Sequence, residues 1–276
     1  MGTHFERTDR PSIGLAWSTG VSPQILSEPD LIDHLEISFE QIVNSPKVLE
    51  LKKSRPIILH CASLSMAGFV DPPDKTIENV LKAVADTETP WLGEHLAFIS
   101  AVPNDESGVP VNIGFTMSPQ LNIQTLERVS QNIDGLRSKL NVPLLLENPP
   151  QYFSMPGSTM NMPEFIAEMC RRSQVDLLID LTHLFIAAKN IGWNAFEALE
   201  LWPLERVVEV HISGASQAEG KWWDNHAAAA PEPVFDLLGF LLKRSRPRAI
   251  TLEYNWAPYI PVSFMHEQVS RIRTSL

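Results

Sequence analysis

The chain has 276 residues, of which 44% are hydrophobic and 20% are charged, a composition typical of a globular protein with a large core. Its net charge of −11 argues against a nucleic-acid partner, and its longest basic stretch, residues 243–248, follows an apolar helical pattern. The two cysteines suit a reducing compartment, and neither a signal peptide nor a membrane-length apolar run is evident, so we expect a cytoplasmic protein without membrane partners.

Short apolar or β-branched segments alternate with longer segments of helical periodicity along the whole chain. The expected strands are residues 13–17, 34–38, 56–60, 91–95, 143–147, 176–180, 207–211 and 249–253. The expected helices are residues 40–53, 75–87, 119–140, 162–172, 194–199, 231–243 and 263–273. Ser118-Pro119 and Asn161-Met162-Pro163 indicate helix starts, because each joins a capping side chain to a proline in the first turn.

This alternation predicts a single (β/α)8 barrel, a TIM barrel, that covers residues 1–276 as one domain. No GxGxxG motif follows the first strand, which argues against an open, dinucleotide-binding sheet. The longest irregular segments, residues 99–118 and 214–231, each follow a strand closely. We therefore expect them on the face where barrel active sites are built.

Potential metal ligands stand at the end of every expected strand from the third to the eighth. Because the carboxyl ends of the strands meet at one face of a barrel, these side chains are expected to converge. Imidazole and carboxylate groups without thiolates suit zinc, iron or manganese, and bound cations would relieve the repulsion among the carboxylates. The nine candidates are His60, His95, Glu147, Asp180, His183, His211, Asp224, His226 and Glu253.

Each candidate alone has an ordinary explanation, since a single strand-end histidine or a DxH motif often occurs without a metal. Five of the eight histidines stand at these positions, however, and this joint pattern favours a metal cluster. Glu147 is central in the strand order and is the expected bridge between two metals. The candidate catalytic residues are Glu147, Asp180 and His211.

Other polar residues near the strand ends receive supporting roles. Glu36, near the end of the second strand, is expected to orient a ligand histidine through the free N–H of its ring. Glu40 is expected to be an acidic residue in the first turn of a helix. Asn148 could be a ligand, a substrate contact or a loop cap, and Trp222-Trp223 could stack on substrate or close the barrel mouth.

The remaining histidines and one cysteine are expected to be structural. His4 lies near the terminus, His34 begins a strand at the end opposite the site, and His266 lies in the last helix. Cys61 follows His60, so strand alternation predicts that its thiol points away from the barrel axis.

The order of these residues is similar to the trinuclear zinc pattern of endonuclease IV, one of the xylose isomerase-like TIM barrels. Their local motifs more closely resemble the multinuclear non-heme iron-dependent oxidative enzymes, the family of the methanobactin biosynthesis oxidase and the 3-thiaglutamate pathway enzyme. His183 stands where many members of that family carry asparagine, and Glu94 where many carry aspartate. The motifs are Leu35-Glu36, His60-x-x-Ser63-Leu64-Ser65, Glu94-His95-Leu96, Leu146-Glu147-Asn148, His211-x-x-Gly214, Asp224-x-His226 with Pro233-Val234-x-Asp236-Leu237-Leu238, and Thr251-x-Glu253.

The resemblance implies two or three iron ions in a mixed-valent state, with O2 as co-substrate. It also implies a ribosomally made precursor peptide, modified usually at cysteine, and a small leader-binding partner protein. Three overlapping metal sites are implied: His60, His95 and Glu147; Glu147, Asp180, His211 and Glu253; and His183, Asp224 and His226.

Two other functions stay open. A trinuclear zinc phosphodiesterase, such as an abasic-site nuclease, would need basic residues in the loops at the rim, where Lys221 stands among acids. A sugar isomerase would normally need a lysine at the rim, and Lys189 is the candidate.

Overall fold

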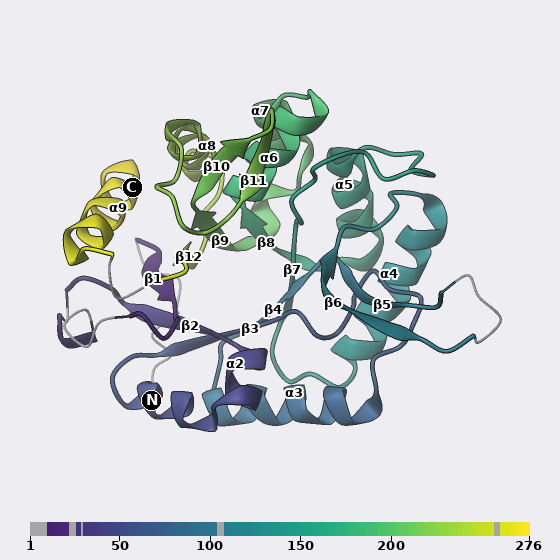
Figure 1. Ribbon diagram of the computed structural model, residues 1–276, viewed down its shortest axis with the longest axis horizontal. Coiled ribbons are helices and arrows are strands. Elements are labelled where there is room, and N and C mark those ends of the chain that lie inside the picture. Colours follow the sequence, from purple (N-terminus) through teal and green to yellow (C-terminus); the bar gives the residue numbers. More distant parts are fainter. Residues whose placement is uncertain (1–9, 22–25, 29, 104–107, 257–259) are drawn as a thin grey trace.

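A computed structural model describes residues 10–21, 26–28, 30–103, 108–256 and 260–276. Eight parallel strands close into a barrel in the order β1, β12, β9, β8, β7, β4, β3, β2 (Figure 1). All eight expected strands are confirmed to within two residues at each end, and so is the barrel. The strands are β1 (Ser12–Ala16), β2 (His34–Ser38), β3 (Ile57–Cys61), β4 (Leu92–His95), β7 (Leu144–Glu147), β8 (Asp176–Asp180), β9 (Val207–Ser213) and β12 (Ala249–Glu253).

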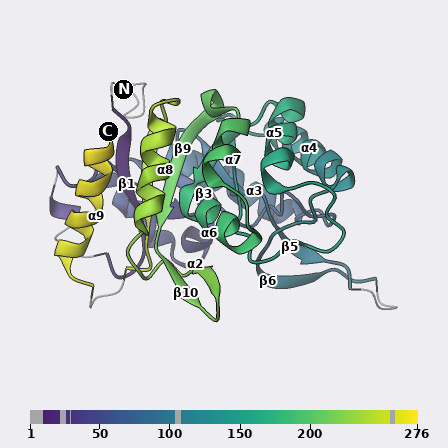
Figure 2. The ribbon, with the colours of Figure 1, turned by 90° about the horizontal axis from the view of Figure 1, so that it is seen from above.

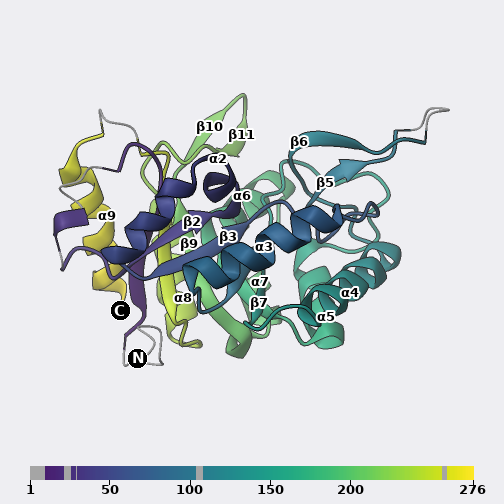
Figure 3. The same cartoon turned by 90° about the horizontal axis from the view of Figure 1, so that it is seen from below.

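Helices surround the strands on the outside of the barrel (Figures 2 and 3). Among the described residues, none of them is long and apolar enough to cross a bilayer. The helices are α2 (Phe39–Asn44), α3 (Asp74–Thr87), α4 (Ile123–Arg137), α5 (Met162–Ser173), α6 (Leu181–Ile191), α7 (Ala195–Leu201), α8 (Glu232–Leu242) and α9 (Val262–Ser275), with the 3-10 helices η1 (Pro46–Lys53) and η2 (Leu204–Arg206).

Two helical segments differ from the sequence-based expectation. The expected helix over residues 40–53 divides into α2 and η1, because Pro46 has no backbone N–H and disfavours helical geometry at Ser45. The helix α6 is not among the expected helices. Its first eight residues are all buried, so the segment lacks the polar face by which an amphipathic helix is recognised.

The two expected helix starts had different outcomes. The start at Ser118 is wrong, because α4 is instead capped by Asn122, whose side chain accepts from the backbone N–H of Thr125. The start at Asn161 is confirmed, and its side chain forms a capping box with Glu164. In both helices the residue that marks the true start is the asparagine whose side chain accepts a hydrogen bond from the first turn.

The two segments expected to be irregular each contain a β-hairpin. β5 (Phe98–Ala101) pairs with β6 (Val111–Met117), and β10 (Ala215–Ala218) pairs with β11 (Lys221–Asp224), both antiparallel. The first follows β4 and the second follows β9. Both hairpins project from the same side of the barrel in Figure 3, the side at which the parallel strands end.

Strand alternation delivers the site residues to the barrel interior. Ile58, Leu145 and Leu178 pack with Trp91 and Ala249 in a small apolar cluster that is separate from the main core. A site residue follows two positions after each of the first three, and side chains two positions apart share one face of a strand. The strand register then sets the neighbours, with His95 beside Glu147 and Asp180 beside His211.

Candidate metal centre

The nine predicted ligands converge at the carboxyl ends of the strands. They form three groups in which the potential ligand atoms lie within 4.8 Å of one another, and these are the three sets that the family resemblance implied. A fourth group, not anticipated as a set, joins Glu36 to His60 and His211. The three expected groups are His60, His95 and Glu147; Glu147, Asp180, His211 and Glu253; and His183, Asp224 and His226.

Glu147 lies at the centre of the cluster, where a bridging ligand was expected. Its Oε2 is 3.2 Å from His60 Nε2 and 3.4 Å from His95 Nε2. Its Oε1 is 3.2 Å from His183 Nδ1 and 3.8 Å from His211 Nδ1. The carboxylate is buried, and neither oxygen has a hydrogen bond within the described residues. Both oxygens are therefore available as metal ligands.

Asn148 positions two of the candidate ligands without pointing its side chain at the cluster. Its amide bonds to both the backbone C=O and the backbone N–H of Asp180, at 2.9 and 3.0 Å. Its own carbonyl lies 3.0 Å from His183 Nδ1, and since a carbonyl only accepts, that nitrogen carries the ring proton. Nε2 of His183 is left to face Asp224, whose Oδ2 is 3.1 Å away.

His95 and His211 are held in the same way, each by an acceptor behind the ring. The backbone C=O of Cys61 is 3.3 Å from His95 Nδ1, which leaves Nε2 facing Glu147. Glu36 Oε2 is 2.9 Å from His211 Nε2, the contact expected of Glu36, and leaves Nδ1 3.4 Å from Glu253. An acceptor behind the ring is the usual way in which proteins orient metal-binding histidines.

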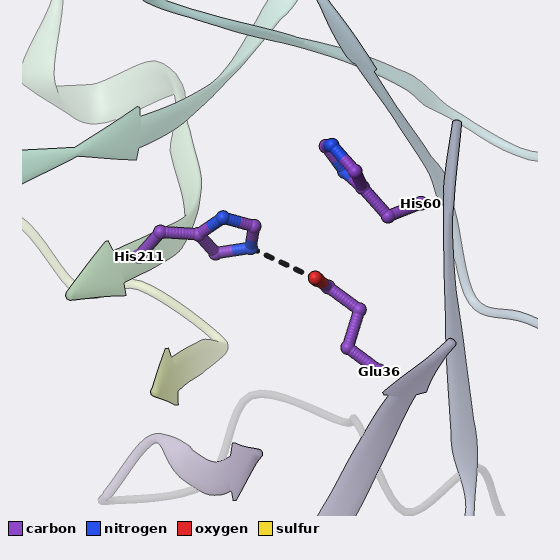
Figure 4. Close-up of side chains that lie close together, drawn as sticks. All are labelled: Glu36, His60 and His211. Atoms are coloured by element: carbon purple, nitrogen blue, oxygen red, sulfur yellow. Dashed lines mark hydrogen bonds and ion pairs between the residues drawn. The ribbon is translucent and has the colours of Figure 1, made fainter. Parts of the chain in front are cut away.

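Five buried atoms of the cluster have no hydrogen-bond partner among the described residues. A buried polar atom without a partner is destabilising, and native proteins contain few of them. In the neutral ring of His211 the proton lies on Nε2, which bonds to Glu36 (Figure 4), so Nδ1 directs a lone pair toward carboxylate oxygens, and this contact needs a metal cation between the groups or a second proton on the ring. The side chains therefore fit a cluster of metal ions. The five atoms are His60 Nδ1, both carboxylate oxygens of Glu147, Asp180 Oδ2 and His211 Nδ1.

In the metal-free chain, protonated histidines offset the negative charge of the buried carboxylates. Burial disfavours a charged ring at His60, but the interaction with Glu147 raises its pKa to about 10. Burial is likewise outweighed at His226, whose bond to Asp224 raises its pKa to about 9. The pKa of Glu253 falls to about 2, because the attraction of His211 overcomes burial. These three groups are therefore charged in the metal-free chain, whereas burial lowers the pKa of His95 and raises the pKa of Asp180 to about 7. Metal ions would displace the protons from His60 and His226.

Two glycines make room for the cluster. A Cβ at Gly93 would lie 2.7 Å from His60 Nδ1, so a side chain there would displace the ring. A Cβ at Gly214 would lie 1.8 Å from the carbonyl oxygen of Ala228. The backbone over residues 224–228 folds tightly onto Gly214, and His226, in the left-handed region at φ 51, donates its N–H to the Gly214 carbonyl.

The two adjacent tryptophans have different roles in the structure. Trp222 packs against Phe185 at a ring-centroid distance of 4.9 Å. Trp223 is 41% exposed and stacks on Tyr152, with centroids 4.7 Å apart. Tyr152 was not anticipated, because its contact with Trp223 joins two loops that are distant in sequence. The stack fixes the β10–β11 hairpin, and with it Asp224, against the loop after β7.

A cavity of about 600 Å³ opens onto the cluster. Its floor includes the more exposed ligands, whereas Glu147, Asp180 and His211 lie deeper. No lysine or arginine lines it among the described residues, and Lys189 lines a separate cavity beside α6 and α7. The larger apolar side chains of the wall are Phe115, Met117, Tyr152, Phe153, Met155 and Trp223.

Glu40 also lines the cavity and supports one of its loops. It lies in the first turn of α2 as expected, but its carboxylate accepts from the hydroxyl of Ser63 and from the backbone N–H of Ala62. The thiol of Cys61 is buried in the main core, as strand alternation predicted.

The other histidines lie away from the cluster. His34 is buried between Ser12 and Thr251 at the opposite end of the barrel, and burial lowers its pKa to about 4. His266 is on α9 and pairs with Glu28. His4 lies outside the described residues.

Solved structures with this fold span several activities. The 3-keto-D-glucoside 4-epimerase from E. coli has a TM-score of 0.63 at 16% identity, and the match covers 96% of this chain and 100% of that chain. Endonuclease IV from Thermus thermophilus has a TM-score of 0.60 at 15% identity and covers 96% and 98%. These similarities support the xylose isomerase-like TIM barrel fold.

Curated relatives carry the description UPF0276 protein. One from Caulobacter vibrioides (strain NA1000 / CB15N) is 30% identical over 237 residues, which is 82% of this chain and 80% of the relative. One from Streptomyces avermitilis is 27% identical over 244 residues, 87% of this chain but only 50% of that relative. The family model described as "RiPP precursor modification enzyme MbnB/TglH/ChrH" matches residues 12–276, where RiPP denotes a ribosomally synthesised and post-translationally modified peptide. The chain therefore belongs to the MbnB/TglH/ChrH family of RiPP precursor modification enzymes.

Proposed function

We propose that this chain is an iron-dependent oxidase that uses O2 to modify a residue, most simply cysteine, of a ribosomally made precursor peptide. The observation that carries the proposal is the set of unpartnered buried ligand atoms around Glu147, in a chain of this family. The nine residues would hold two or three metal ions in the three groups described above. Iron in these sites would supply one-electron chemistry with O2, which redox-inactive zinc cannot.

The exposure of the ligands supports approach of a substrate from one side. The side chains of His95, Asp224, His226 and Glu253 are 13–25% exposed and line the cavity. Glu147, Asp180 and His211 are at most 1% exposed. A peptide side chain in the cavity would therefore meet these four more exposed ligands first, while the apolar wall would exclude water from the reacting group.

The size and chemistry of the cavity favour a short peptide segment. A volume of about 600 Å³ is that of a small-ligand pocket, so it accommodates the residue to be modified and its neighbours but not a whole precursor. We accordingly expect a separate, small leader-binding protein to hold the rest of the peptide. Of the described residues that line the cavity, none is a lysine or arginine, which a phosphodiester substrate would call for.

The proposal is tested by anaerobic purification followed by metal analysis and O2 uptake with a cysteine-containing precursor peptide. A short open reading frame next to the gene would supply the candidate peptide. We expect bound iron, and O2 uptake that depends on the peptide and is absent from the Glu147→Gln variant. Three zinc ions, no iron and no O2 uptake with peptide would exclude the oxidase.

A trinuclear zinc phosphodiesterase is the second candidate. It is favoured by the third ligand group, since His183, Asp224 and His226 complete a set that resembles the zinc pattern of endonuclease IV. Cleavage of a duplex containing an abasic site by the zinc-loaded protein would support this function. The sugar isomerase loses its candidate lysine, because Lys189 does not line the cavity over the cluster.

A further inference from the structure

Gln151, in the loop after β7, lines the cavity outside the metal-ligand groups, and its side chain differs from its polar neighbours in the wall. Ser38 and Ser118 use their hydroxyls in hydrogen bonds within the protein, and Glu40 uses its carboxylate in the same way. Thr116 is exposed to solvent. Gln151 is only 4% exposed, yet its side-chain amide makes no hydrogen bond within the described part of the chain.

The unpartnered amide of Gln151 is open to a bound molecule. A side-chain amide has a carbonyl acceptor and an NH2 donor, and a buried polar group without a partner is destabilising. Among the described residues, the fully enclosed atoms that lack a partner do not include this amide, so its remaining surface faces the cavity that Gln151 lines. Water can bond to the amide there, but a substrate that displaces the water must itself supply a donor and an acceptor.

We propose that Gln151 binds the main chain of the peptide substrate, accepting from the backbone N–H of one substrate residue and donating to the backbone C=O of the same residue. In an extended chain these two groups point the same way, as they do in the hydrogen-bonded pairs of an antiparallel ladder. One side-chain amide therefore matches both groups at once. The proposal rests on the proposed function and assigns a contact that recognises a peptide whatever its side chains are.

The segment that holds Gln151 is anchored on both sides by parts of the chain that carry metal ligands. It starts shortly after Glu147, the last residue of β7. The side chain of Asn190 donates to the backbone carbonyls of Gln151 and Trp222, at 3.4 and 2.8 Å, and so joins the segment to β11, which ends at Asp224. A main chain bound by Gln151 would therefore be held at a fixed place in relation to the cluster.

A phosphodiester substrate fits Gln151 less well than a peptide does. Phosphate oxygens only accept hydrogen bonds, so they would serve the NH2 group of Gln151 and leave its Oε1 buried without a donor. A peptide serves both ends of the amide. Since no lysine or arginine lines the cavity among the described residues, the chemistry of the wall favours a peptide on two separate grounds.

The test compares Gln151→Met with Gln131→Met in peptide binding. Methionine has nearly the length of glutamine but lacks its NH2 donor and carbonyl acceptor. Gln131 is on α4 and lines a different cavity, so its replacement controls for the substitution itself. The probe is a fluorescently labelled segment, around the cysteine, of the precursor peptide encoded next to the gene, and fluorescence anisotropy measures its binding to the zinc-loaded protein. We expect binding about 10-fold weaker in Gln151→Met and changed by less than about 2-fold in Gln131→Met.

Backbone esters in the probe test the contact itself. Each amide around the cysteine is replaced in turn by an ester, which removes one N–H. With the unaltered protein, the ester at one position should weaken binding about 10-fold, whereas in Gln151→Met the same ester should cost less than about 2-fold because its partner is already absent. Circular dichroism and metal analysis check that the variant folds and keeps its ions. Gln151→Asn, which keeps the amide but shortens its reach, should also weaken binding and serves if the methionine variant does not fold.

Three results would overturn this role of Gln151: equal peptide binding by Gln151→Met and the unaltered protein, ester losses of the same size in both, or metal ions lost from Gln151→Met. The last result would mean that Gln151 supports the metal site and not the peptide. If the unaltered protein neither binds nor oxidises the peptide, the proposed function fails as well. Turnover by the unaltered protein, together with unchanged peptide binding in Gln151→Met, contradicts the role of Gln151 alone.

Discussion

The inner and outer halves of the cluster are built in different ways. Glu147, Asp180 and His211 stand at the ends of neighbouring barrel strands, where ladder hydrogen bonds and burial fix them. The outer half is the group of His183, Asp224 and His226. Asp224 is the last residue of the β10–β11 hairpin and His226 follows it, and their side chains are 13% and 25% exposed. A ligand set on a closed barrel is preorganised, whereas a set on a hairpin is only as well ordered as the contacts that hold the hairpin. We therefore expect the inner ions to bind tightly and the outer ion to exchange readily.

Replacing the central carboxylate should have the largest effect. Glu147→Gln removes the charge that faces the ring nitrogens of four histidines, so metal binding at the two inner groups should weaken by at least about 100-fold, and turnover should cease. The metal-free variant should still fold into the barrel but unfold about 3 kcal/mol more easily, because it leaves buried imidazolium groups unpaired. Metal analysis, turnover and urea unfolding measure these effects. Retained turnover would exclude Glu147 as the bridge.

A substitution that displaces the segment carrying Asp224 and His226 should weaken the outer ion and leave the inner ions in place. Gly214→Ala places a Cβ against the carbonyl of Ala228 and must displace the segment that carries Asp224 and His226. The outer ion should bind about 10- to 100-fold more weakly while the inner ions stay. Gly239→Ala is the control, since a Cβ there meets nothing within 4 Å, and it should change no affinity. Equal loss of all ions in Gly214→Ala would contradict a separable outer half.

The metal-free chain should lose stability as the pH rises. The folded-state pKa values of His60 and His226, about 10 and about 9, exceed the 6.5 of an ordinary histidine, so the folded state binds these protons more tightly. Their contribution is complete below about pH 6.5 and disappears as the pH rises through about 9 to 10. Urea unfolding of the metal-free chain across this range tests the sign, and a rising free energy of unfolding would contradict the assigned pairs.

The same titration predicts the opposite trend for metal binding. Since the metals displace these protons, metal affinity should increase with pH over the same range, and binding should release protons into a weakly buffered solution. A pH-indicator dye during metal titration measures the release. Metal uptake without proton release would mean that the ions bind elsewhere.

Removing the aromatic stack should have the smallest effect. Trp223→Ala deletes the contact with Tyr152, which is worth about 0.5–1.5 kcal/mol, and should weaken the outer ion by about 10-fold at most. Phe153→Ala is the matched control, because Phe153 is also exposed in the cavity wall but is not part of this stack. A larger effect on the inner ions than on the outer ion would contradict the expectation that the hairpin contacts hold only the outer ion.

The barrel and the convergence of the nine residues could be predicted from the sequence because both follow from local rules. A strand has a period of two, and its end is marked by the change from apolar residues to polar ones. The position of Glu36 behind a ligand histidine could be predicted for the same reason, because it also stands near a strand end.

The parts that were missed depend on contacts between segments distant in sequence. The two hairpins form through antiparallel pairing that no period in their short strands indicates. The helix α6 is hidden by burial on all sides of its first two turns. Tyr152 and the carboxylate of Glu40 acquire their roles only through Trp223 and Ser63, which other loops bring to them.

The metal content of the anaerobically purified chain tests the central claim most directly. The account predicts two or three metal ions per chain, most of them iron, and the loss of at least two from Glu147→Gln. Fewer than one ion per chain in the unaltered protein, or full metal content in Glu147→Gln, would contradict a multinuclear cluster centred on that carboxylate.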